Sequence, residues 1–271
     1  MNRNLFAAAA FVAASGLVHA QADWGFISTA GSPDPVGAFN LANPSGPNAV
    51  LGFVDGNFNR GMDFIRRDSF YYYVSTDELN DPGDRGLWLW DKNVNTQLAT
   101  VDYSDSGDGA ASFDPATNTF FVAVDDDDDT DGDSLYAWTD LNGTPTFTEI
   151  GETGLSSFIG IAVNPADGLL YGYDSSSEGL YTIDTTDGST TLIGLSGESL
   201  GAIGGMDFND DGSVLLLSSG DDLFTVDITD GSLTAAGNIG LNSSALSFRV
   251  PTPGTAALLG LGGLAATRRR R

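Results

Sequence analysis

One loop of the chain has the residue types and spacing of a calcium site. Carboxylates alternate with other residues and a glycine precedes the last of them, at Asp127, Asp129, Asp131 and Asp133. Such carboxylates converge on one ion in EF-hand loops, where glycine permits a sharp turn. The bidentate glutamate expected at the twelfth position is replaced by Trp138. The loop predicts a weak Ca²⁺ site, and calcium is the one cofactor suggested; ordinary solvated acidic loop is the alternative.

Chemistry that needs imidazole or thiolate is excluded. The chain has no cysteine and one histidine, His19, which lies in a segment expected to be removed. The mature chain therefore has no Ser-His-Asp triad, no Cys-His pair and no ordinary zinc site. Its 37 acidic residues are the groups that a glycosidase uses, since paired carboxylates suffice for that reaction. No pair stands out, so glycoside hydrolysis is the alternative function and the chain is expected not to be an enzyme.

The composition favours an all-β fold and excludes one class of partner. Among 271 residues there are 35 glycines, which implies many turns, and 41% hydrophobic residues, which can build a core. The net charge of -26 repels phosphate backbones, because nucleic-acid binding requires cations that neutralise them. Nucleic acid is therefore not an expected partner.

The N-terminus predicts export. Arg3 precedes an apolar stretch, residues 5–18, and Val18 and Ala20 occupy the two positions that a signal peptidase reads. We expect residues 1–20 to be a signal peptide cleaved after Ala20. The alternative is a short buried N-terminal helix.

The C-terminus has three parts in a fixed order. Pro251, Thr252 and Pro253 precede thirteen small and apolar residues, 255–267, and the chain ends in Arg268, Arg269, Arg270 and Arg271. A short apolar segment before a basic cluster predicts transient membrane association. The order resembles the PEP-CTERM sorting signal of Gram-negative bacteria, with Thr252 in place of its glutamate. The resemblance implies processing by an exosortase-type enzyme in an envelope that makes exopolysaccharide. A packed C-terminal helix is the alternative.

Between these ends, residues 21–250 form a repeat with a net charge of -31. A short strand recurs every 40 to 50 residues: Gly61–Phe64, Ala110–Phe113, Gly160–Val163, Gly205–Phe208 and Ala245–Phe248. Further strands follow each of the first four, and four strands per period of this length indicate a β-propeller blade.

The last repeat contains one strand, and the N-terminus supplies what it lacks. Residues 24–30, 36–41 and 50–54 read as its second, third and fourth strands. We therefore predict a five-bladed β-propeller closed by pairing of N- and C-terminal strands in one blade, which removes an exposed sheet edge. A β-sandwich explains neither the period nor the complementary ends. Residues 160–194 resemble the repeat of uncharacterised bacterial propeller domains, which implies the fold and no activity.

The acidic residues fall into repeated and non-repeated groups. Asp91, Asp184 and Asp227 each follow a third strand, where aspartate bonds amides of the turn. Asp63 and Asp207 precede a core phenylalanine on the first strand, and we expect them to be structural, with channel lining as the alternative. Loop order predicts 22 of the 37 acids on one rim.

The sequence thus predicts an exported, noncatalytic binding or structural component of the cell envelope or exopolysaccharide matrix. The expected partners are signal peptidase, an exosortase-type enzyme, and a polysaccharide or another envelope protein. The expected location is the surface or matrix of a Gram-negative bacterium.

Overall fold

The computed structural model describes residues 24–29, 34–45, 49–54, 59–65, 70–75, 86–91, 94–100, 109–124, 132–201 and 203–249. Its regular elements in these ranges are all β-strands, which confirms the all-β prediction. They form four antiparallel sheets. Within the described ranges, no helix has the length and hydrophobicity needed to cross a membrane. Residues 1–20 and 251–271, predicted to be processing signals, lie outside the description.

Three of the sheets have four strands that follow one another along the chain. The first contains β4 (Asn59–Ile65), β5 (Phe70–Ser75), β6 (Gly86–Asp91) and β7 (Val94–Thr100). The second contains β8 (Gly109–Asp114), β9 (Thr119–Val124), β10 (Ser134–Thr139) and β11 (Thr146–Glu152). The third contains β12 (Phe158–Val163), β13 (Leu170–Asp174), β14 (Gly179–Ile183) and β15 (Thr190–Leu195).

The fourth sheet combines six strands from both ends of the described chain. Its order is β16 (Gly204–Phe208), β17 (Leu215–Val226), β18 (Leu233–Arg249), β1 (Trp24–Thr29), β2 (Asp34–Asn40) and β3 (Ala49–Val54). β17 pairs first with β16 and then with the start of β18. The end of β18 pairs with β1, which confirms the predicted pairing of the N- and C-terminal strands. We call residues 204–238 the β16 half, and residues 243–249 with β1 to β3 the β1 half.

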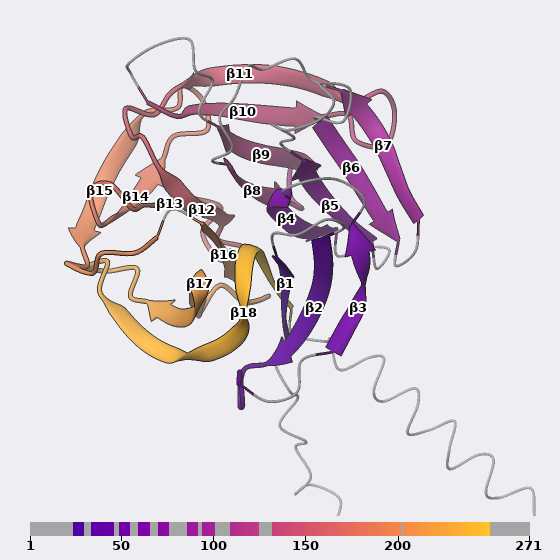
Figure 1. Ribbon diagram of the computed structural model, residues 1–271. Coiled ribbons are helices and arrows are strands. Elements are labelled where there is room, and N and C mark those ends of the chain that lie inside the picture. Colours follow the sequence, from indigo (N-terminus) through magenta and orange to yellow (C-terminus); the bar gives the residue numbers. More distant parts are fainter. Residues whose placement is uncertain are drawn as a thin grey trace, which may run out of the picture.

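The strands that begin each unit lie around a common centre, with the sheets arranged around it (Figure 1). β4 contacts β8, β8 contacts β12, and β12 contacts β16. β16 contacts β18, and β18 contacts β4. These contacts join the five inner strands in a closed ring.

Burial decreases from the inner to the outer strands. All residues of β9, β12 and β13 are buried, whereas every residue of β11 and β15 is exposed or half-buried. The apolar cores lie between neighbouring sheets. Between the third sheet and the β16 half, for example, Tyr171 meets Phe208 edge-on with ring centroids 5.3 Å apart. Packing of sheet faces against one another therefore stabilises the ring.

A β-bulge recurs between the third and fourth strands of every unit. The residue before the register shift is fully buried in each case: Val36, Leu87, Leu135, Leu180 and Leu223. Its partners are Gly52, Ala99, Gly151, Gly194 and Gly237. A Cβ on Gly194 would collide with the carbonyl of Asp230 in the next unit. A small residue at this bulge therefore leaves room for a turn of the next unit to pack against it.

Candidate functional site

The centre of the ring is filled. Two consecutive residues from each inner strand enclose a space of about 10 Å³. They are Gly61 and Met62, Ala110 and Ala111, Ile159 and Gly160, Gly205 and Met206, and Ala245 and Leu246. A space of this size holds one water molecule at most. Between these described residues there is no room for a sugar.

Glycine makes this close approach possible. A Cβ added to Gly160 would lie 2.5 Å from the backbone nitrogen of Met206, and one added to Gly205 would collide with that of Leu246. A Cβ on Gly61 would collide with the Cβ of Ala111. The ring is therefore closed by backbone packing, which no side-chain rotation can open.

The two repeated aspartates of the inner strands are buried and hold neighbouring strands together. Asp63 Oδ2 accepts the Phe113 N–H at 2.7 Å, and Asp207 Oδ2 accepts the Phe248 N–H at 2.6 Å. The Ser247 hydroxyl lies between them, 3.1 Å from Asp63 Oδ1 and 3.3 Å from Asp207 Oδ2. These contacts agree with the structural interpretation of both carboxylates.

The same contact recurs with a serine on β8 and is absent on β12. Ser112 occupies the corresponding place on β8, and its hydroxyl oxygen accepts the Val163 N–H at 3.0 Å. Ala162 occupies that place on β12 and has no acceptor to offer. The Phe208 N–H is instead bound at 2.7 Å by Oδ1 of the adjacent Asp207. Sequence reasoning expected a structural role for the two aspartates but did not identify the serines that join neighbouring strands in the same way.

The turn aspartates act as predicted where the structure describes their side chains. Asp184 Oδ1 accepts the Thr186 N–H at 2.8 Å, and Asp227 Oδ1 accepts the Thr229 N–H at 2.9 Å. Each threonine hydroxyl donates to the same oxygen at 2.6 Å. These bonds, the hydroxyl bond first, hold the pKa of each carboxyl below its usual 3.8. The turn role is confirmed for both residues, and the side chain of Asp91 lies outside the description.

Replacing Thr229 with valine should raise the pKa of Asp227, because the hydroxyl bond is the main cause of its depression. A folded pKa below the unfolded value contributes stability that is present above about pH 4 and lost as the pH falls through the folded pKa. An NMR titration of the carboxyl carbon measures this. Thr186→Val should shift Asp184 alone, and an unchanged pKa of Asp227 in Thr229→Val would contradict the assignment.

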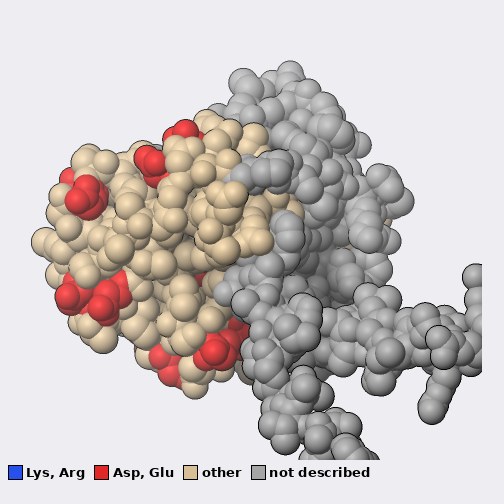
Figure 2. All heavy atoms as spheres, turned by 90° about the horizontal axis from the view of Figure 1, so that it is seen from below, with Lys and Arg blue, Asp and Glu red and all other residues tan. Residues whose placement is uncertain are grey.

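The described surface is acidic on more than one rim. Figure 2 shows carboxylates at several separate places and no lysine or arginine among the coloured residues. Nine of the described acids lie on turns of the rim opposite the one predicted to be crowded: Asp114, Asp140, Asp167, Asp184, Asp187, Asp210, Asp211, Asp227 and Asp230. Many of the 22 acids assigned to the predicted rim lie outside the described residues.

Asp133 is the member of the predicted calcium loop whose surroundings are described. It is buried, and its Oδ2 accepts the Phe158 N–H at 3.0 Å. Its carbonyl oxygen accepts the N–H of Thr153 at 3.0 Å and the Thr153 hydroxyl at 2.5 Å. Asp127, Asp129 and Asp131 lie outside the described residues, within which no three metal-binding side chains of the histidine, cysteine or carboxylate types converge. The calcium site stays a prediction.

If the loop binds calcium, the ion should raise the melting temperature more than magnesium does at equal ionic strength. A missing bidentate glutamate places the expected affinity at about 10⁻⁴ to 10⁻³ M. Stabilisation at ten times Kd is then about 1.4 kcal/mol. Asp129→Asn with Asp131→Asn should abolish the difference, and equal shifts with both ions would indicate screening of a highly charged domain.

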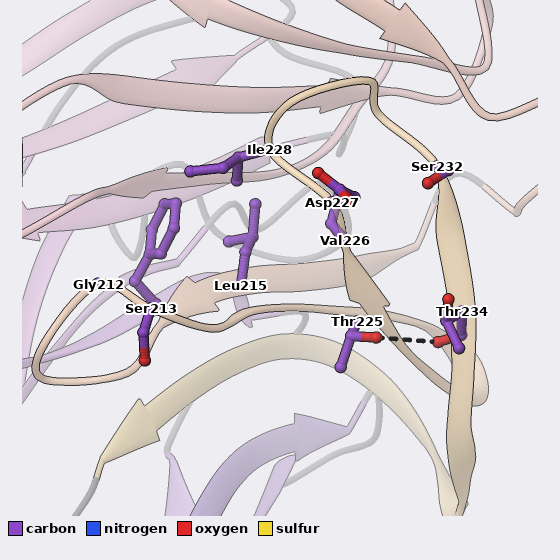
Figure 3. A pocket seen from close by; sticks show the side chains of 10 residues that line it. Gly212, Ser213, Leu215, Thr225, Val226, Asp227, Ile228, Ser232 and Thr234 are labelled. Atoms are coloured by element: carbon purple, nitrogen blue, oxygen red, sulfur yellow. Dashed lines mark hydrogen bonds between the residues drawn. The ribbon is translucent and has the colours of Figure 1, made fainter.

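A groove on the β16 half is a candidate binding site. It lies where the turn of residues 209–214 faces the turn of residues 227–232, and its volume is about 350 Å³. Figure 3 shows Leu215 and Ile228 directed toward one another, with Asp227 and Ser232 on the second turn. The other lining residues are Phe208, Gly212, Ser213, Thr225, Val226 and Thr234. Sequence reasoning missed this groove.

No protein-family model and no curated protein matches the chain. Several hundred chains of solved structures do match it. A chain from the crystal structure of a nidogen/laminin complex superimposes with a TM-score of 0.56 and 9% identity, covering 83% of this chain and 97% of that one. The fold is β-propeller-like. Because 457 solved chains match and this one is so distant in sequence, the likeness shows the propeller-like fold alone.

Proposed function

We propose that this protein is a noncatalytic binding or structural component of the cell envelope or exopolysaccharide matrix, built on a five-bladed β-propeller. The noncatalytic part of this proposal rests on the size of the space at the centre of the ring. A propeller glycosidase works with carboxylates across a central pocket, whereas ten small or apolar residues leave about 10 Å³ at this centre. The buried carboxylates nearest to it, Asp63 and Asp207, are bound to backbone amides.

The five-bladed arrangement is the finer part of the proposal. Three four-stranded sheets each supply one blade, and the six-stranded sheet supplies two, its β16 and β1 halves. Five inner strands in ring contact and five equivalent β-bulges support this count. The pairing of β1 with the end of β18 closes the ring.

Export and processing complete the proposal and rest on the sequence of the two ends. The mature protein should lack residues 1–20 and the arginine cluster 268–271. Intact-mass measurement of the secreted form checks this. A mass that includes Arg268 to Arg271 would show that the C-terminal segment is not a processed sorting signal.

Retention on a polysaccharide tests the binding role. The secreted protein is passed over a panel of immobilised envelope polysaccharides at physiological ionic strength. Specific retention on at least one is expected, with competition by the same soluble polymer. Passage through the whole panel, with equal passage over immobilised envelope proteins, would contradict the proposal.

A further inference from the structure

The groove between the two turns of the β16 half has hydrogen-bonding groups that the protein does not use. In the part of the chain that the structure describes, the hydroxyls of Ser232 and Thr234 make no hydrogen bond. The Thr229 amide and hydroxyl both bind Oδ1 of Asp227, and no other described residue donates to Oδ2 of Asp227. One wall thus offers two hydroxyls and one carboxylate oxygen to a ligand.

Apolar residues line the base and one edge of the groove. Leu215 and Val226 are buried at the base, and Ile228 is half-buried above them (Figure 3). A site with hydroxyls beside an aliphatic side chain matches a sugar ring, which has hydroxyls at its edge and C–H groups on its face. The volume of about 350 Å³ lies within the usual range for small-ligand sites.

The charge of the groove further restricts the class of ligand that it can bind. Asp227, whose pKa lies below its usual 3.8, is ionised at neutral pH. No lysine or arginine occurs among residues 132–201 and 203–248, which include every residue that lines the groove and the whole third sheet. Anionic ligands are therefore repelled. A calcium ion needs six to eight oxygens, and one carboxylate with two hydroxyls does not supply them.

The neighbouring third sheet has the same hydroxyl residues but a different turn. Ser189 and Thr191 correspond to Ser232 and Thr234. At the fourth position of the first turn it has Asp167 in place of Gly212, and Asp167 Oδ2 binds the Tyr171 hydroxyl and the Asn164 amide, both at 3.1 Å. Gly212 has no side chain, and its backbone packs against Asn164 and Ala166 of the third sheet. The first turn of the β16 half thus departs from that of the third sheet.

We propose that this groove binds a neutral sugar unit of the matrix polysaccharide. Sugar hydroxyls donate to Asp227 Oδ2 and exchange hydrogen bonds with the hydroxyls of Ser232 and Thr234, while the C–H face lies against Ile228. This inference deepens the proposed function and rests on it. It specifies a neutral saccharide and one of the five units.

Calorimetric or NMR titration of the secreted protein tests the proposal. The probes are neutral trisaccharides of glucose, galactose and mannose, with a galacturonate trisaccharide as the anionic comparison. At least one neutral trisaccharide should bind with a Kd of about 1 mM, as expected for a few sugar atoms in an open site. Ser232→Ala with Thr234→Val should weaken it about tenfold or more, because two hydrogen bonds are lost.

Ser189→Ala with Thr191→Val is the matched control and should leave the Kd unchanged. Melting curves establish that both double variants are folded. Absence of binding by every neutral trisaccharide, equally tight binding of galacturonate, or equal weakening in the control would overturn the proposal. If the Ser232/Thr234 variant is retained on polysaccharide as the native protein is, the groove assignment fails and the proposed function stands. If the native protein is not retained at all, the proposed function fails.

Discussion

Replacing Gly160 with alanine is expected to destabilise the folded protein by about 3 kcal/mol. The new Cβ would lie 2.5 Å from both the backbone nitrogen and the Cβ of Met206 on the adjacent inner strand. Since one obstacle is backbone, a rotamer change cannot relieve the overlap, and β12 and β16 must separate. The shift then spreads to the other contacts of the ring. Urea unfolding followed by fluorescence measures the loss.

Gly201→Ala is the control for this substitution. The nearest atom to a Cβ at Gly201 is the Ser219 hydroxyl oxygen at 3.7 Å, an ordinary van der Waals contact. Stability should therefore change by less than about 0.5 kcal/mol. Equal unfolding midpoints for Gly160→Ala and the native protein would show that the inner strands are not packed as closely as described.

Ending the chain at Asn242 is expected to abolish cooperative unfolding. The lost segment is the part of β18 that pairs with β1, and it carries the buried side chains of Leu246 and Phe248. Their burial contributes about 5 kcal/mol, which is comparable to the whole stability of an ordinary domain. The loss also exposes the edges of β1 and of β4, which makes aggregation the expected outcome.

A chain ending at Val250 is the matched comparison, because it keeps all of β18 and lacks only the predicted sorting signal. It should melt as the longer chain does. Thermal melts by circular dichroism distinguish the two lengths. A cooperative melt with the native midpoint for the chain ending at Asn242 would contradict closure of the ring by the terminal strands.

Much of the fold could be predicted because the repeat shows in local sequence. The spacing of five similar strands revealed their equivalence, and one incomplete repeat at each end revealed the pairing of β1 with β18. The narrow centre of the ring could also be predicted from the sequence. The first residue of each repeated strand is glycine or alanine, at Gly61, Ala110, Gly160, Gly205 and Ala245. Residues this small at one recurring position indicate close approach of backbones.

The contacts between units could not be predicted, because they join residues far apart in the sequence. Ser247 meets Asp63 across 184 residues of sequence, and no spacing rule connects them. The groove could not be predicted either, because it depends on how two turns of one unit lie next to each other. Runs of acidic residues indicated a metal site in the loop near Asp133 instead. The Asp133 carboxylate, however, binds a backbone amide of β12.

The central claim is that this propeller-like protein holds a polysaccharide without cutting it. Reducing ends are therefore measured over a long incubation of the secreted protein with the polysaccharide that retains it best. The account predicts no release above that of the polymer alone, at any pH from 4 to 8. Steady release in proportion to protein concentration, lost when a pair of carboxylates is replaced by amides, would contradict it and identify a glycosidase.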